Sequence, residues 1–537
     1  MIQNYFARED ILDNLNKRLN GFKQGYRQNI AIIGDELTGK TSLLHNFLSK
    51  FNDPEIIPVY LELRQDPTRH FFNRFIGTIL YNFSKSNFQD IPENLDSLIS
   101  INQNIIPETI NKIKNILSSI EKTKEEEIFL EILDMIDNLG REANKFIILI
   151  FDEFQYLEEL KLKNLYREWS KKIMIQKNIM YVVTSSYKFK ARSILTRDLA
   201  LLFGNFEIID LEPFDIEESN LFIQQSLQPL NLEKNLVNFL IHFTGGHPFY
   251  LKIILQTIQD LALKNNNVID SDIVINGLEN ILFDNLGMLN LRFLHYLDKL
   301  IGTKGTSDYL SILFSIANGH NKLKDIAFII HKQRKDISIK INRLLELDVI
   351  SKTGDFFKIN DRLFCFWLKY VYQEKLNAMS FDTKASRQIF IRKINRMIND
   401  FILISNKELL ERVMELFRLF NDESVQLEKK KFRLNHFKEI KPLQFDSQRI
   451  KEGVLGRSTD SLWITALKKD KLNEEDIVDF INECKKYKHK VQHKIIIAFN
   501  EADTNVKLLA KEEKIWTWNI ANINYLLDLY SKPRIVL

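Results

Sequence analysis

The stretch of sequence that decides the fold is Ile30-Ala31-Ile32-Ile33-Gly34-Asp35-Glu36-Leu37-Thr38-Gly39-Lys40-Thr41-Ser42-Leu43-Leu44. Its apolar beginning is typical of a buried strand, and its end is typical of an amphipathic helix. Between them, the spacing Gly34-x-x-x-x-Gly39-Lys40-Thr41 satisfies the P-loop pattern. The alternative is a chance Gly-Lys-Thr in an ordinary turn. The flanking strand and helix favour the P-loop, because they are the context that the motif requires.

A P-loop binds phosphate in a defined way. Backbone N–H groups wrap the phosphate oxygens, the lysine reaches the β/γ-phosphates, and the threonine hydroxyl ligates magnesium. The helix that follows also presents its positive end to the phosphates. We therefore expect ATP and Mg²⁺ as ligands, bound by the loop residues Gly34, Asp35, Glu36, Leu37, Thr38, Gly39, Lys40, Thr41 and Ser42.

The composition excludes several protein classes. With 537 residues, 45% of them hydrophobic, the chain can form several globular domains. Its net charge of +4 gives no overall basic field for nucleic acid. Cys365 and Cys484 lie too far apart in sequence for a disulfide framework or a cysteine zinc site. Without a leader pattern or a run near about 18 apolar residues, we expect a cytoplasmic protein with no membrane contact.

A second apolar run, residues 146–151, ends in the carboxylates Asp152 and Glu153. A buried parallel strand delivers such residues to the carboxyl edge of a sheet, where ligands bind in open α/β folds. This is the pattern of a Walker B strand. Asp152 would hold Mg²⁺, and Glu153 would orient and deprotonate the attacking water. The alternative for two adjacent acids is a solvated strand end.

A third buried strand, residues 179–186, ends in Thr184-Ser185-Ser186. We assign γ-phosphate sensing to Ser185, with Thr184 and Ser186 as close alternatives, although these hydroxyls could instead cap the next helix. Further strands are expected at 56–63 and 206–211. Because strands and helices alternate up to Pro213, we predict a mostly parallel sheet with helices on both faces.

Residues 214–300 have an entirely helical pattern, as expected of a lid. The sequence Gly245-Gly246-His247-Pro248 interrupts it, because a glycine pair ends one helix and Pro248 suits the first position of the next. Taken alone, this is a corner between two helices.

Residues 301–375 have the pattern of a winged helix: three helices followed by a hairpin near 348–359. The expected recognition helix carries Arg334, Lys335, Lys340 and Arg343. These side chains could contact DNA phosphates, or the module could serve only for packing within the protein.

Residues 376–445 are expected to form a helical connector that ends in a basic stretch, 429–441. That stretch suits a solvated link better than a nucleic-acid arm. Strand and helix patterns alternate again from 446 to 537, which predicts a C-terminal α/β domain.

The order of these motifs resembles the archaeal ATPase family, in the STAND branch of AAA+ P-loop ATPases. The resemblance covers residues 1–370 and includes Phe6-Ala7-Arg8-Glu9 and the Gly-Gly-His-Pro corner. It implies that Phe6, Arg8 and Pro248 approach the adenine or ribose. Where the family often has a Leu-Tyr-Gly-Arg-like element, this chain has Leu202-Phe203-Gly204-Asn205, so Arg192 and Arg197 are left as candidates for an arginine finger that acts in trans.

The C-terminal pattern resembles the restriction-endonuclease-like fold of archaeal family members. This resemblance implies that Asp460 and Lys468 could fill two roles of a metal-dependent nuclease site. Ala466 stands where a second acid is expected, so we expect a degenerate module that does not cut DNA.

The predicted architecture is an α/β P-loop NTPase core (1–213), an all-helical lid (214–300), a winged helix-turn-helix (301–375), a helical connector (376–445) and an α/β nuclease-like domain (446–537). The expected function is an ATP-hydrolysing switch, monomeric or an ATP-dependent oligomer. The alternative is a DNA-binding or defence-type effector or nuclease in which ATP only gates assembly.

Overall fold

The computed structural model describes residues 6, 8–64, 66–160, 162–199, 206–301, 306–377, 383–427, 430–487, 491–500 and 503–536. Ala7, the 202–205 element and Lys429 lie outside these ranges. The chain forms two compact units. The first holds Met1–Pro213 with Glu346–Asp348, and the second holds Phe214–Leu345 with Val349–Leu537.

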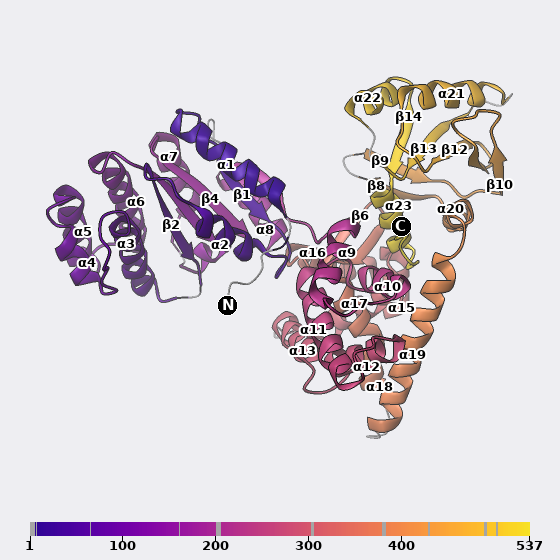
Figure 1. Ribbon diagram of the computed structural model, residues 1–537, viewed down its shortest axis with the longest axis horizontal. Helices are drawn as coiled ribbons and strands as arrows, with labels where there is room; N and C mark the ends of the chain where they lie inside the picture. The colour runs from indigo at the N-terminus through magenta and orange to yellow at the C-terminus, as the bar shows by residue number, and fades with distance from the viewer. Residues whose placement is uncertain are drawn as a thin grey trace. The chain divides into compact units, whose positions relative to one another are not determined.

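The first unit is built on a five-stranded parallel sheet in the order β2-β3-β4-β1-β5 (Figure 1). Its strands are β1 (Asn29–Ile33), β2 (Ile56–Glu62), β3 (Phe146–Asp152), β4 (Ile179–Ser185) and β5 (Phe206–Asp210). The register pairs Glu62 with Asp152 and Ile33 with Ser185. The carboxyl ends of the strands therefore meet at one edge, next to the P-loop.

Alternate residues of each strand feed two separate hydrophobic cores. Ile30 and Ile32 of β1 pack with the first two helices, whereas Ala31 and Ile33 pack with the helices on the opposite face. The first face carries α1 (Glu9–Lys23) and α2 (Lys40–Lys50). The other core includes α3 (Thr68–Ser84), α4 (Leu95–Asn102), α5 (Pro107–Ser119), α6 (Glu125–Glu142) and α7 (Leu165–Ile175). The predicted parallel sheet with helices on both faces is confirmed.

The second unit begins with helices. They are α9 (Ile216–Leu227), α10 (Lys234–Thr244), α11 (Pro248–Lys264), α12 (Ser271–Leu282) and α13 (Met288–Ile301). Three further helices and a hairpin follow at the predicted places: α14 (Thr306–Ala317), α15 (Leu323–Ile330), α16 (Arg334–Glu346), β6 (Ile350–Thr353) and β7 (Phe356–Ile359). After them come α17 (Arg362–Trp367), α18 (Gln373–Asn377), the long α19 (Thr383–Ser405) and α20 (Leu409–Arg418).

The predicted helical connector is wrong at its end. Helices stop at Arg418, and the hairpin of β8 (Glu423–Leu427) and β9 (Lys430–Leu434) follows, with β9 inside the basic stretch. Every second residue of β8 is buried and the alternate ones are exposed, which is the period of a strand. The exposed residues of β9 are all basic, and this obscured the hairpin in the sequence.

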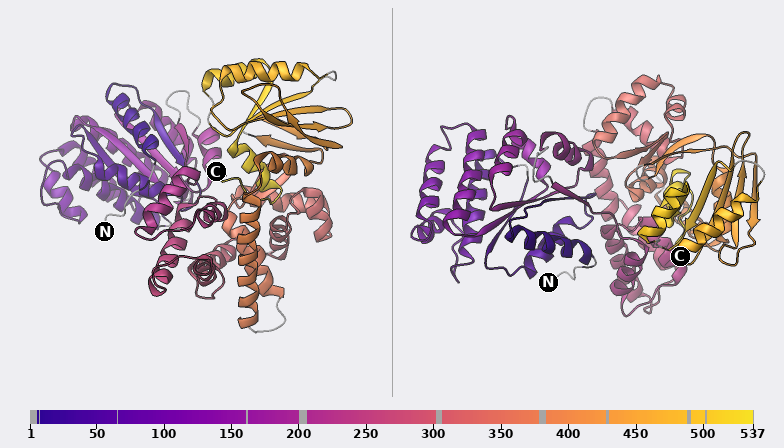
Figure 2. Two further views of the ribbon diagram at one scale, coloured as in Figure 1. Left: turned by 45° about the vertical axis from the view of Figure 1, so that its right-hand side comes forward. Right: turned by 90° about the horizontal axis from the view of Figure 1, so that it is seen from above.

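A second five-stranded sheet, β10-β11-β12-β13-β14, completes the chain. It begins earlier than the sequence indicated, with β10 (Glu439–Gln444) and β11 (Glu452–Arg457), followed by β12 (Leu462–Lys468), β13 (His493–Ala498) and β14 (Ile515–Asn519). The first three strands are antiparallel and the last three are parallel. Helices α21 (Glu474–Lys485) and α22 (Thr504–Glu512) cover one face, and α20 and α23 (Ile520–Leu529) pack on the other (Figures 1 and 2).

In the described ranges, every helix falls short of the length and apolarity that a bilayer crossing needs.

Candidate active site

The phosphate loop between β1 and α2 requires glycine at both of its defining positions. A Cβ on Gly34 would lie 2.5 Å from the carbonyl oxygen of Leu211, so a side chain there would displace the backbone. Gly39 has a φ of 104°, in the left-handed region that L side chains rarely adopt. The loop shape is thus tied to these two residues.

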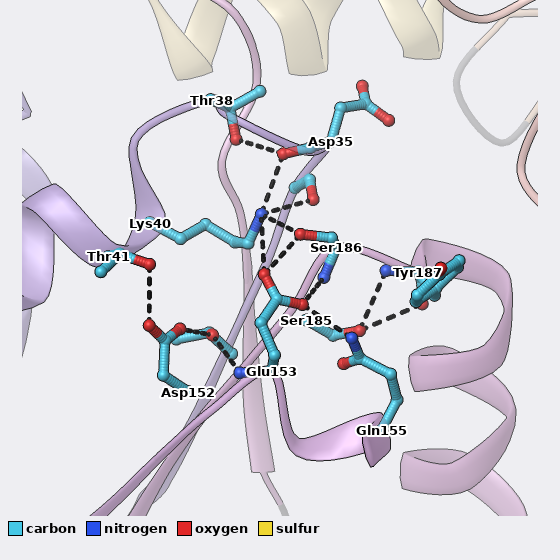
Figure 3. Close-up of polar contacts among 12 residues, drawn as sticks. Asp35, Thr38, Lys40, Thr41, Asp152, Glu153, Gln155, Ser185, Ser186 and Tyr187 are labelled. Atoms are coloured by element: carbon cyan, nitrogen blue, oxygen red, sulfur yellow. Dashed lines mark hydrogen bonds and ion pairs between the residues drawn. The ribbon is translucent and has the colours of Figure 1, made fainter. Parts of the chain in front are cut away.

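Lys40 lies inside this loop, with only 3% of its side chain exposed. Its ammonium group donates to the carbonyl oxygens of Gly34 (3.0 Å) and Asp35 (2.9 Å), and to Ser186 Oγ (2.8 Å) (Figure 3). Burial lowers the pKa of Lys40, and the carboxylates of Glu153 and Asp152 partly oppose this. A cation is therefore held at the centre of the loop, where the P-loop lysine is expected.

Thr41 and Asp152 are brought together from α2 and the end of β3. Thr41 Oγ1 donates to Asp152 Oδ2 over 2.7 Å, and the Tyr60 hydroxyl donates to the same oxygen over 2.7 Å. The Thr184 hydroxyl donates to Asp152 Oδ1. A hydroxyl beside a carboxylate provides the hard oxygen ligands that Mg²⁺ prefers, so Thr41 and Asp152 fit this ion. Tyr60 lies outside the motifs that predict the site.

Glu153 is held firmly beside Lys40. Its backbone has a φ of 57°, which is unfavourable for a residue other than glycine and occurs mostly where structure or function requires it. Its carboxylate accepts from the Ser186 backbone N–H (2.8 Å) and the Gln155 amide (2.7 Å). The carboxylate also lies 3.8 Å from Lys40 Nζ. This network fixes the direction of an acid that is 22% exposed.

Of the two serines at the end of β4, Ser186 contacts Lys40 and Glu153. Ser185 Oγ hydrogen-bonds to the backbone of Tyr187, accepting from its N–H (3.1 Å) and donating to its carbonyl (3.3 Å). Ser186 Oγ instead accepts from Lys40 and donates to Glu153 (Figure 3). β4 ends at Ser185, and the chain beyond it brings the next hydroxyl to the loop.

Part of the chain is similar to known proteins. Residues 5–254 match a family model described as an ATPase domain predominantly from Archaea. Over these residues the chain resembles an archaeal-type ATPase domain. The chain also resembles an uncharacterised ATP-binding protein of Pyrococcus horikoshii, with 25% identity over 258 residues, which is 46% of this chain and 73% of the relative.

Two solved structures are also similar to the chain. A Walker-type ATPase of Pyrococcus abyssi has 19% identity and a TM-score of 0.48, covering 68% of this chain and 96% of its own. The ORC2 protein of Aeropyrum pernix, in ADPNP–ADP complexes, has 12% identity and a TM-score of 0.44, covering 74% and 97%.

The residues predicted to approach adenine or ribose are divided between the two units. In the first unit, Phe6 is half-buried, and Arg8 donates to the carbonyl oxygen of Glu212, just beyond β5. Pro248 belongs to the second unit, where it begins α11. Of the arginine-finger candidates, Arg192 is ion-paired with Asp210 of the ATPase domain itself.

The glycine pair before Pro248 has a clear structural cause. Gly245 and Gly246 have φ values of 68° and 79°. A Cβ on Gly246 would lie 2.1 Å from the carbonyl oxygen of Phe214, whose N–H donates to the Gly246 carbonyl over 3.0 Å. The corner is therefore fixed against the start of the second unit.

The structure separates the proposed nuclease pair. Asp460 lies two residues before β12 and Lys468 is the last residue of the strand, so the seven-residue strand, which rises about 3.3 Å per residue, places the two at opposite ends. Lys468 Nζ instead pairs with Asp476 at the start of α21, over 3.0 Å. Within the residues that the structure describes, no group of three or more His, Cys, Asp or Glu is arranged to hold a metal ion.

The four basic residues assigned to DNA contact differ in their surroundings. Arg334, Lys335 and Arg343 are exposed on α16. Lys340 is only 22% exposed and pairs with Asp308 over 3.1 Å, with its ammonium over the Tyr309 ring. The Lys340 side chain therefore helps to pack α16 against α14.

Proposed function

We propose that the protein is an ATP-hydrolysing molecular switch of the STAND/AAA+ type. The observation that carries this proposal is the convergence of Lys40, Glu153 and Ser186 beside the Thr41–Asp152 pair at one edge of the sheet. A cation, two acids and two hydroxyls thereby surround the loop that binds phosphate, as phosphoryl transfer to water requires.

Each residue has a role in this proposal. The loop amides and Lys40 bind the β- and γ-phosphates, and Ser186 detects the γ-phosphate. Glu153 accepts the proton of the attacking water. Its fixed carboxylate lies beside Lys40, which binds the γ-phosphate that the water attacks. Thr41 and Asp152 would hold Mg²⁺, which neutralises phosphate charge when bound. Phe6, Arg8 and Pro248 remain the residues proposed for the adenosine.

The second unit has contacts through which nucleotide state could reach other modules. Tyr250, on the helix that Pro248 begins, donates its hydroxyl to Asp361 beside the β7 strand. The Gly245 backbone lies against Arg362, because a Cβ there would be 3.6 Å from Arg362 Cδ. Arg362 in turn pairs with Asp528 of α23. These contacts support a coupling of the corner to the proposed winged helix, 301–375, and the C-terminal α/β module.

DNA binding is the second candidate function. The exposed basic residues Arg334, Lys335 and Arg343 favour it. Contacts with phosphates weaken steeply with salt, so binding of a duplex should fall between 50 and 200 mM salt by about tenfold or more and weaken further in an Arg343→Ala variant. If duplex binding does not depend on salt, or if the Arg343→Ala variant binds the duplex as the wild type does, the module has only a packing role.

We propose that the C-terminal module has no nuclease activity, that the protein acts in the cytoplasm, and that it is a monomer or an ATP-dependent oligomer.

The nucleotide site is tested by binding of a fluorescent ATP analogue with magnesium. Lys40→Ala should weaken binding by about 100-fold, because it removes charge-assisted bonds to phosphate. Lys50→Ala is the matched control, since Lys50 is exposed at the far end of the same helix and should bind as the wild type does. Normal binding by the Lys40→Ala protein would overturn the proposed site.

A further inference from the structure

The phosphate loop contains an acidic residue whose charge opposes its ligand. Asp35 directly follows Gly34, and its backbone carbonyl accepts from Lys40 and Thr38. Its carboxylate would repel an incoming triphosphate unless that charge were neutralised or turned aside. Figure 3 shows the Asp35 carboxylate directed away from Lys40.

The partner of this carboxylate is Lys188, the first residue of α8 (Lys188–Ser193). Lys188 Nζ lies 2.8 Å from Asp35 Oδ2, with side chains that are 25% and 33% exposed. Burial lowers the pKa of Lys188, but the Asp35 carboxylate outweighs it and the net pKa is raised. Lys188 therefore stays charged at neutral pH.

Two lysines thus connect the same two segments in opposite directions. Lys40 of the phosphate loop donates to Ser186, and Lys188, two residues after Ser186, donates to Asp35 of the phosphate loop. The first bond places a cation among the groups that face phosphate. The second bond holds the Asp35 carboxylate away from Lys40 and fixes the first half of the phosphate loop.

We propose that Lys188 is a positioning residue for the nucleoside triphosphate: it neutralises Asp35 and holds its carboxylate away from the phosphates. This inference rests on the proposed function only in taking ATP as the ligand. Lys188 acts through Asp35 and needs no contact with the nucleotide. Its removal should therefore weaken ATP binding and leave the chemical step intact.

The test measures the Kd of a fluorescent ATP analogue and, separately, kcat and KM for ATP. Lys188→Gln should raise Kd and KM by about tenfold, because the unpaired Asp35 carboxylate then repels the phosphates, with kcat unchanged. Adding Asp35→Asn should restore the affinity, because the unpaired carboxylate is then gone. Lys190→Gln is the matched control: Lys190 lies on the same helix but pairs with Glu158, away from the loop.

Two outcomes would overturn the inference. One is wild-type affinity in the Lys188→Gln protein. The other is a double variant that binds as weakly as Lys188→Gln alone, since Lys188 would then act by another route. Failure of the proposed hydrolysis would look different, because the wild type would bind the analogue without turnover and the Kd comparison would still hold.

Discussion

Replacing Asp528 by Asn should strongly destabilise the second unit. The Asp528 side chain is 1% exposed and pairs with Lys358 (2.7 Å), Arg362 (2.5 Å) and Arg534 (2.7 Å). Although burial alone would raise the pKa of Asp528, the three cations hold it well below its usual value. The variant keeps the size of the side chain but leaves three cations without their common anion.

The size of the effect follows from this burial. Removing one partner of a buried ion pair costs about 3–5 kcal/mol, and the low end applies because each cation keeps about a quarter of its side chain exposed and can regain water. With an m-value of about 3 kcal/mol/M, a loss of about 3 kcal/mol lowers the urea midpoint by about 1 M.

The assay is urea unfolding followed by tryptophan fluorescence. Four of the five tryptophans, Trp367, Trp463, Trp516 and Trp518, belong to the second unit, so the signal reports mainly on it. Asp400→Asn is the control, since Asp400 is 64% exposed and lies 3.7 Å from Arg396, and it should cost less than about 0.5 kcal/mol. Equal midpoints for the Asp528→Asn protein and the control would refute the stabilising role of the cluster.

Two further predictions concern His242 and Tyr60. Burial and the nearby Arg362 hold the pKa of His242 well below 6.5, so His242 is neutral in the folded protein at neutral pH. Its contribution to the free energy of unfolding is therefore present above pH 6.5 and is lost as the pH falls below that value. His242→Asn should therefore show a smaller drop in urea midpoint between pH 7 and pH 5 than the wild type; an equal drop would place that dependence on other groups. Tyr60→Phe removes the hydroxyl that donates to Asp152 and should raise the Mg²⁺ concentration for half-maximal ATP turnover by about tenfold, whereas an unchanged Mg²⁺ dependence would show that this hydroxyl does not tune the site.

The core fold and the centre of its site could be predicted because their signals are local. Each of three patterns reflects what the backbone needs within a few residues: the P-loop spacing, the apolar run before Asp152 and the glycines before Pro248. The left-handed φ of Gly245 and the close contact at Gly34 are the physical causes of those patterns.

The residues that escaped prediction depend on contacts between distant parts of the sequence. Tyr60 reaches Asp152 only because β2 pairs with β3, and Lys188 reaches Asp35 only because β4 lies beside β1. Ser186, which contacts Lys40, lies just beyond the end of β4, where the alternation of a strand makes no prediction. The β8–β9 hairpin was missed because its exposed face is basic, which resembles a solvated link.

The central claim is that Glu153 activates water at this site, and steady-state ATP turnover by a Glu153→Gln variant tests it most directly. Loss of a positioned base should lower kcat by about 10²–10⁴-fold. The ATP affinity should stay near that of the wild type, because Lys40 and the loop amides are kept. Undiminished kcat in a variant that binds ATP normally would contradict the account.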